Sequence, residues 1–144
     1  MYNLNREKDE SAFAACATPA DFLAHLNAVN DDAFIACLDI GHAEMRGSNT
    51  SAPQMIRALG TGLQALHIHD NDQWHDSHRI PFSMKIDFDA VVTALKEIQY
   101  NGYFTLEADQ FLRGYTKENI YDGILKLVES AKKLAEMFDG KQMG

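Results

Sequence analysis

Cysteine, proline and tryptophan are scarce in this sequence of 144 residues, which contains two cysteines, three prolines and one tryptophan. Cys16 and Cys37 form no C-x-x-C pair, and each lies between apolar residues. This pattern predicts reduced, buried thiols and gives no sign of a disulfide framework or a redox motif. A chain of this length can bury roughly 68–70% of the surface that it exposes when unfolded, so one domain over residues 1–144 is expected without covalent or metal cross-links.

Long apolar runs and an excess of positive charge are also absent. No stretch of about 18 apolar residues occurs, so a membrane-spanning helix is not expected, and no basic region followed by an apolar region suggests a signal peptide. The sequence has 13 Lys and Arg against 21 Asp and Glu, a net charge of -8. Binding to nucleic acid requires basic residues that face the phosphates. We therefore expect a cytoplasmic protein with no nucleic-acid and no membrane partner.

Helix signals occur at four places along the chain. Each is a residue type that caps helix N-termini, followed by apolar residues at helical spacing. Gly60 is expected to end the second helix, because glycine readily adopts the conformation that follows a helix. We predict four helices that begin just after these capping residues: Thr18, Ser51, Asp87 and Thr116.

Three short apolar runs, at 34–38, 63–68 and 103–106, are predicted to be strands. The first is a continuous apolar run, which is typical of a strand covered on both faces. Strands that alternate with helices indicate a parallel sheet with right-handed crossovers. Three parallel strands leave two unpaired edges, whereas sheets average about five to six strands, so further pairing is expected.

Each predicted strand ends at a residue that can bind a metal ion, namely Asp39, His67 or Glu107. In parallel α/β folds the ligand site lies at the carboxyl ends of the strands. Five of the six histidines fall between residues 42 and 78, at strand ends or in the loops that follow them. Packing does not account for such clustering, so a ligand site is expected at these strand ends.

Each of these residues also has a purely structural interpretation. An Asp after a strand often caps a helix or a turn, so Asp39 alone is as compatible with structure as with function. A single His in an apolar strand is more often a hydrogen-bonded core residue than a ligand. Glu107 differs, because an uncompensated carboxylate at the inner end of a strand is unfavourable and a nearby cation would relieve it.

Five motifs together resemble one known superfamily. They are CLDIGHA at 37–43, LHIHDN at 66–71, DSH at 76–78, IDF at 86–88 and GYFTLE at 102–107. In order and spacing they look like the closing half of a xylose isomerase-like TIM barrel, the fold of sugar and sugar-phosphate isomerases and epimerases and of endonuclease IV. The resemblance implies an α/β fold, a partial (half) TIM barrel of three to four parallel strands with outer helices. Residues 1–3 would be the tail of the fourth strand.

The resemblance also implies a site for a divalent metal ion. Members of the superfamily hold the ion with Glu, Asp, His and Glu from the ends of four strands, and the last three correspond to Asp39, His67 and Glu107. His67 is chosen over His69 because the family pattern has an acid three residues after the ligand, as Asp70 is here. An oxygen-rich donor set favours Mn or Mg, while Co, Fe and Zn are also compatible.

The family's ketose epimerases imply further roles. Their two glutamates exchange a proton on opposite faces of a carbon beside a carbonyl, and the metal stabilises the charge of the enediolate. Glu107 resembles one glutamate of this pair. The other precedes the segment that resembles Met1 onwards and is absent, which suggests a truncated reading frame or a shortened relative. His42, Arg79 and Trp74 are the expected contacts of a sugar or sugar phosphate.

The loop at 71–85 leaves two alternatives open. Asp76 and His78 resemble the Asp-x-His pair that adds metal ligands in endonuclease IV, so they either hold a second ion or belong to a solvated loop. Trp74 and Phe82 either form an apolar wall for a sugar ring or pin the loop down.

Three functions are compatible with these motifs. A metal-dependent sugar isomerase or epimerase is the main expectation, with weak activity because only Glu107 of the glutamate pair is present. An endonuclease IV-like phosphodiesterase is disfavoured by the net charge of -8. The third is a non-catalytic half-barrel with a vestigial site. The unpaired sheet edges predict a homodimer in which two half-barrels approximate a closed barrel.

Overall fold

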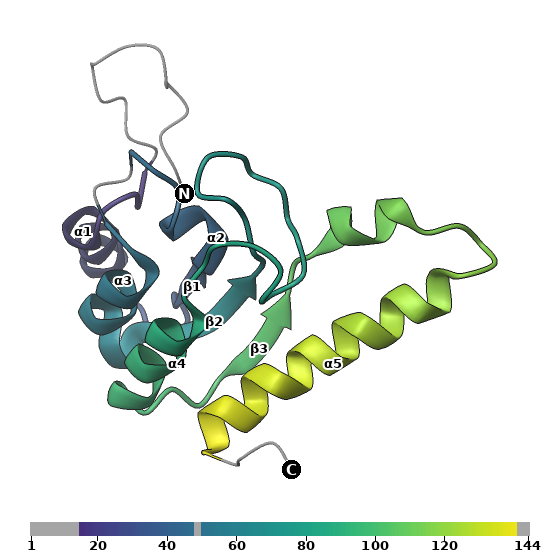
Figure 1. Ribbon diagram of the computed structural model, residues 1–144. Helices are drawn as coiled ribbons and strands as arrows, with labels where there is room; N and C mark the ends of the chain where they lie inside the picture. The colour runs from purple at the N-terminus through teal and green to yellow at the C-terminus, as the bar shows by residue number, and fades with distance from the viewer. Residues whose placement is uncertain (1–14, 48–49, 141–144) are drawn as a thin grey trace.

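The computed structural model describes residues 15–47 and 50–140 (Figure 1). Helices and strands alternate along these residues, as predicted, whereas the expected fourth-strand residues 1–3 lie outside them. The strands are β1 (Ala36–Asp39), β2 (Leu63–Ile68) and β3 (Tyr103–Leu106). The helices are α1 (Pro19–Val29), α2 (Ile40–Ala43), α3 (Ala52–Leu59), α4 (Phe88–Glu97) and α5 (Ile120–Asp139), with 3-10 turns η1 (Gly60–Gly62) and η2 (Asp109–Gly114).

The strands form one open parallel sheet in the order β1-β2-β3. Their register aligns Asp39 with His67, and His67 with Thr105. Because the strands are parallel, their carboxyl ends lie at the same edge of the sheet, where Glu107 follows β3 directly. This arrangement confirms the predicted α/β fold of a partial TIM barrel.

Helices α3 and α4 pack against one face of the sheet (Figure 1). Leu38 and Leu66 point to that face and are buried, while Cys37 and His67 point the opposite way and are exposed. The prediction that the first strand is covered on both faces is therefore wrong. The thiols are free as predicted, but Cys37 is exposed and Cys16 only partly buried. The uncovered face corresponds to the inside of a barrel, which three strands cannot close.

Strand β1 begins two residues later than the apolar run predicts. The backbone N–H of Phe34 donates to the carbonyl of Asp31, 2.9 Å away, which makes a turn. Phe34 and Ile35 consequently lie before the strand and are exposed. The bounds of the other two strands agree with the prediction.

Three of the four predicted helix caps are correct. Thr18, Ser51 and Asp87 each accept a hydrogen bond from a backbone N–H in the first turn of the helix that follows. Thr116 is not a cap, because α5 begins only at Ile120. The side chain of Asn119 instead accepts a hydrogen bond from the N–H of Thr116, at 2.7 Å, and the resulting turn delays the helix.

Helix α5 runs along the β3 side of the molecule and packs against β3 and α4 (Figure 1). Gly123, Ser130 and Leu134 are buried along it, whereas Tyr121 and Leu125 are exposed. Among the described residues, no helix has the length and apolar character needed to cross a membrane.

Candidate metal centre

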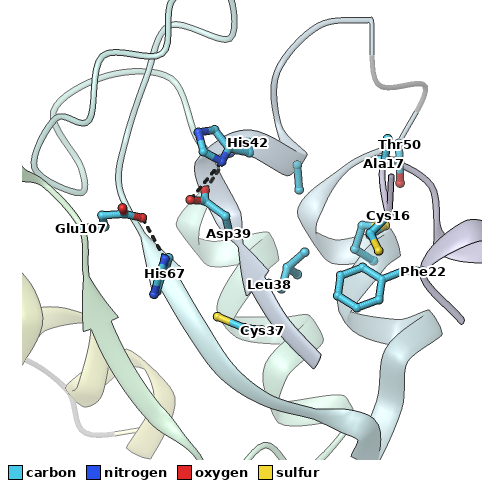
Figure 2. A pocket seen from close by; sticks show the side chains of 12 residues that line it. Cys16, Ala17, Phe22, Cys37, Leu38, Asp39, His42, Thr50, His67 and Glu107 are labelled. Atoms are coloured by element: carbon cyan, nitrogen blue, oxygen red, sulfur yellow. Dashed lines mark hydrogen bonds and ion pairs between the residues drawn. The ribbon is translucent and has the colours of Figure 1, made fainter. Parts of the chain in front are cut away.

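Asp39, His67 and Glu107 converge at the carboxyl edge of the sheet (Figure 2). One ligand atom from each lies within 4.8 Å of the others, and Nδ1 of His67 is 2.9 Å from Oε2 of Glu107. The three residues come from three neighbouring strands, so the backbone hydrogen bonds of the sheet hold them together. We call this group the sheet-edge triad.

Asp39 accepts a backbone hydrogen bond in addition to its place in the triad. Its side chain caps α2 by accepting a hydrogen bond from the N–H of His42 at 2.9 Å, and its other oxygen lies 3.1 Å from Nδ1 of the same residue. Burial alone would raise the pKa of Asp39, but the hydrogen bonds from His42 and the close contact of the His69 ring hold that pKa well below its usual range. Asp39 is therefore ionised at neutral pH.

A second group of metal-binding side chains lies beside the triad and comprises His42, His69, Asp76 and His78, again with ligand atoms within 4.8 Å of one another. Asp76 is central to it, because its Oδ1 lies 3.2 Å from Nε2 of His42 and 3.1 Å from Nε2 of His78. We call this group the histidine cluster. The two groups adjoin at Asp39, whose Oδ1 lies 3.1 Å from Nε2 of His69.

His69 has both ring nitrogens buried without a well-aligned hydrogen bond. The residue is 0% exposed, and its ring stacks on that of His78 with centroids 4.0 Å apart. A buried imidazole without proper partners is unfavourable unless something else binds its nitrogens. The nitrogen and carboxylate donors of the histidine cluster therefore fit a divalent cation, and the oxygen and nitrogen donors of the triad fit one as well.

The sequence profile of the family described as "Xylose isomerase-like TIM barrel" matches residues 5–136. The chain belongs to this family. Solved structures agree in fold: a D-tagatose 3-epimerase-like protein aligns with a TM-score of 0.66 and 23% identity over 91% of this chain and 45% of its own. An L-ribulose 3-epimerase aligns with a TM-score of 0.63 and 18% identity over 88% of this chain and 43% of its own.

A curated relative is the uncharacterized protein MJ1311 of Methanocaldococcus jannaschii, which is 28% identical over 119 residues, 83% of this chain and 40% of the relative. The uncharacterized protein y4fM of Sinorhizobium fredii is 34% identical over 64 residues, 44% of this chain and 20% of the relative. This chain thus spans less than half the length of the relatives and structures that it matches.

A pocket of about 320 Å³ extends from the triad along β1 (Figure 2). The triad and His42 form its polar end, and Phe22, Leu38 and Met55 contribute to its apolar end. Burial would lower the pKa of His42, but the hydrogen bond and charge of Asp39 outweigh burial and raise it. Both ring nitrogens of His42 face carboxylates, Nδ1 that of Asp39 at 3.1 Å and Nε2 that of Asp76 at 3.2 Å, and the residue lines the polar end of the pocket.

The loop that follows β2 carries Asp76 and His78 over the sheet edge. Asp70, which is fully buried, accepts hydrogen bonds from the backbone N–H groups of Met84 at 2.7 Å and Ile86 at 3.1 Å. Nδ1 of His78 lies 2.9 Å from the carbonyl oxygen of Glu107, so the loop also touches the end of β3. The structure thus brings the expected second-ion residues next to the triad, with both side chains partly buried.

Trp74 and Arg79 do not line the pocket of the triad. Trp74 is exposed, and the guanidinium of Arg46 lies 4.7 Å from its ring centroid. Arg79 is also exposed, 6.0 Å from the ring centroid of Phe111. Phe82 packs on Phe88 with centroids 5.0 Å apart, so it pins the loop to the helix layer.

Two other glutamates of this chain, Glu44 and Glu97, form contacts outside the triad. Glu44 accepts a hydrogen bond from the N–H of Ala52 at 2.7 Å, at the start of α3. Glu97 pairs with Arg57 between two outer helices. Neither lies in the triad, so Glu107 is its one glutamate among the residues that the structure describes.

Sequence analysis did not identify His69 as a member of the site. The His-x-x-acid pattern selects His67, and the alternation of a strand places His67 on the open face. His69 follows the end of β2, so strand alternation gives no direction for its side chain. The proximity of Gly41 is the structural feature that admits the ring, and no sequence pattern pairs these two positions.

Gly41→Ala should lower the free energy of unfolding by roughly 1–3 kcal/mol, the usual effect of forcing an extra carbon into a packed site. A Cβ at Gly41 would overlap the ring of His69, so the ring must move. Urea unfolding followed by circular dichroism measures the change. Gly114→Ala is the matched control, because a Cβ there meets no atom within 4 Å. Equal stability of the two variants would contradict the described packing of His69.

Proposed function

We propose that this chain forms the metal-binding part of a sugar or sugar-phosphate isomerase or epimerase. The observation that carries the proposal is the convergence of Asp39, His67 and Glu107 within 4.8 Å at the carboxyl ends of three parallel strands. Membership of the xylose isomerase-like family supports it. Structural neighbours named as 3-epimerases of tagatose, ribulose and psicose agree with a ketose as the substrate class.

The proposed roles follow from the chemistry of the side chains. Asp39, His67 and Glu107 would hold a divalent ion, with Mn or Mg favoured by the two carboxylates. Such an ion would supply the positive charge that stabilises an oxygen anion formed beside a carbonyl. Glu107 removes the proton from the carbon next to that carbonyl, and His42 donates a hydrogen bond to a substrate oxygen.

The histidine cluster is proposed to hold a second ion through Asp76 and His78, assisted by His69. Two imidazoles and one carboxylate suit zinc or cobalt better than magnesium. The nitrogens of His69, which are buried without a well-aligned hydrogen bond, support this assignment. Substrate contacts from Arg79 and Trp74 stay predictions, because neither lines the pocket.

His67→Ala should weaken the binding of Mn²⁺ at least tenfold. Loss of a residue that merely supports a ligand already lowers metal affinity about 10–100-fold, so loss of a ligand should lower it at least as much. Isothermal titration calorimetry of the full chain with Mn²⁺ measures the affinity.

His75→Ala is the matched control for this titration. His75 is exposed and its Nδ1 lies 2.7 Å from Oδ2 of Asp72, away from both metal-binding groups. We expect the control to bind Mn²⁺ like the unaltered chain. Equal Mn²⁺ affinity in His67→Ala would remove His67 from the ligand set and with it the support for the proposed function.

A further inference from the structure

A third group of metal-binding side chains lies at the start of α1 and comprises Cys16, Asp21 and His25. The group offers a thiol sulfur, a carboxylate oxygen and an imidazole nitrogen, and these three atoms all lie within 4.8 Å of one another. Its residues belong neither to the sheet-edge triad nor to the histidine cluster. We call it the helix-start group.

The local structure of α1 accounts for this arrangement. Asp21 and His25 are four residues apart, so one helical turn places them on the same face. Nδ1 of His25 lies 3.5 Å from Oδ1 of Asp21 and 2.8 Å from the backbone carbonyl oxygen of Asp21. Cys16 precedes the helix, and its backbone N–H donates a hydrogen bond to Oδ2 of Asp21. The carboxylate of Asp21 therefore holds Cys16 and His25 on either side of it.

The distances within the helix-start group suit one small ion. Zinc bonds of about 2.0–2.3 Å to sulfur, nitrogen and oxygen place the ligand atoms of one tetrahedral ion roughly 3.3–3.8 Å apart. The separation of 3.5 Å between Asp21 and His25 is already in this range. The side chains of Asp21 and His25 are 43% and 50% exposed, so they are free to rotate and the ion can enter from solvent.

The donor set determines which class of ion fits. A thiol and an imidazole favour Zn²⁺ or Co²⁺ over Mg²⁺, which prefers oxygen ligands. Burial and the charge of Asp21 raise the pKa of Cys16, so the thiol keeps its proton when no ion is bound. Binding therefore forms a sulfur–metal bond, breaks the S–H bond and releases the proton to water.

The surrounding sequence is acidic. Residues 15–45 contain five Asp and Glu and no Lys or Arg, so no basic side chain of this range competes for the carboxylate of Asp21. The N-terminus of a helix disfavours a cation. The thiolate and the carboxylate together bring two negative charges, which match the charge of a divalent ion.

We propose that Cys16, Asp21 and His25 bind one zinc-class divalent ion, which fastens residue 16 to the first two turns of α1. The site is separate from the proposed function and does not depend on it. Its role is structural, because the ion links the turn before the helix to the helix itself. Cys16 and Phe22 both line the pocket that extends from the triad, so the ion also holds one wall of that pocket in place (Figure 2).

Titration of the full chain with Co²⁺, followed by absorption, tests the site. A thiolate bound to Co²⁺ gives a charge-transfer band in the near ultraviolet, and neither the triad nor the histidine cluster contains a thiol. We expect this band in the unaltered chain and its loss in Cys16→Ser. Cys37→Ser is the matched control, because it removes the other free cysteine and should keep the band.

His25→Ala tests the second ligand, and circular dichroism first establishes that it is folded. Loss of a ligand should weaken Co²⁺ binding about tenfold or more. Mn²⁺ binding at the triad should be unchanged in Cys16→Ser, so the two sites are judged separately.

Alkylation provides a measurement that needs no change at Cys16. Because the free thiolate is the nucleophile, Zn²⁺ should slow the reaction of Cys16 with iodoacetamide about tenfold or more relative to EDTA, as measured by mass spectrometry. This protection should be lost in His25→Ala. The absence of a Co²⁺ band in the unaltered chain, a band that survives Cys16→Ser or disappears in Cys37→Ser, or equal Co²⁺ affinity in His25→Ala would overturn the proposal.

Discussion

Glu107→Gln should lower the rate of proton exchange at C3 of a ketose by roughly 10²–10⁴-fold, the usual contribution of one positioned acid or base. Glutamine keeps the size of the side chain and a hydrogen-bonding oxygen but cannot accept a proton. Proton NMR in deuterated water measures the exchange as loss of the C3 proton signal. Glu97→Gln, on the outer helix layer, is the matched control and should exchange like the unaltered chain.

The monomeric chain should also exchange this proton faster than it inverts the carbon. Inversion requires a second acid on the opposite face, and Glu107 is the one glutamate of the triad among the described residues. We expect inversion to be slower than exchange by about the same factor of 10²–10⁴. The comparison is made at concentrations where light scattering gives 16.1 kDa.

Two outcomes would contradict this account of catalysis. Inversion that keeps pace with exchange in the monomer would show that a second acid already stands at the site. Unchanged exchange in Glu107→Gln would show that another residue removes the proton. The first outcome would leave Mn²⁺ binding unchanged. Calorimetry with Mn²⁺ therefore distinguishes a wrong assignment of the catalytic acid from a wrong location of the metal site.

Asp70→Ala should lower the free energy of unfolding by an amount on the order of 3 kcal/mol, because it leaves buried backbone N–H groups without acceptors. The Asp70 carboxylate accepts hydrogen bonds from Asn71, Met84 and Ile86 and is fully buried. The same change should release the loop that carries Asp76. Urea unfolding and Mn²⁺ titration together measure both effects.

Asp70→Asn and Asp87→Ala provide the controls for this experiment. Asparagine retains one acceptor oxygen, so the loss should be smaller than with alanine. Asp87 is an exposed cap of α4 that accepts one hydrogen bond from Ala90, and its removal should lower the free energy of unfolding by about 1 kcal/mol. A loss in Asp70→Ala no larger than that of Asp87→Ala would show that Asp70 does not organise the loop.

The sequence by itself determined the alternation of strands and helices and the strand ends at which chemistry is concentrated. These features depend on neighbours in the chain. A capping side chain such as Thr18 bonds to an N–H three residues away, and an apolar run of strand length favours a strand with at least one buried face. Because parallel strands end at one edge, Asp39, His67 and Glu107 could be expected to meet once the strands were identified.

Where local bonds compete, the sequence was less informative. Thr116 and Asn119 are both suitable caps, and the hydrogen bond between them moved the start of α5 to Ile120. The apolar run from Phe34 contains its own turn, so the strand is shorter than the run. The predicted and observed element boundaries differ by a few residues because a short segment can adopt several conformations of similar energy.

Only the tertiary structure decided which side chains share a site across the chain. It placed His69 against Gly41 and Asp76, sent Trp74 and Arg79 away from the pocket, and packed Phe82 on Phe88. It also left one face of the sheet open, although the first apolar run suggested cover on both. The physical reason is that burial and side-chain contacts depend on segments distant in sequence, whereas periodicity and capping report only on adjacent residues.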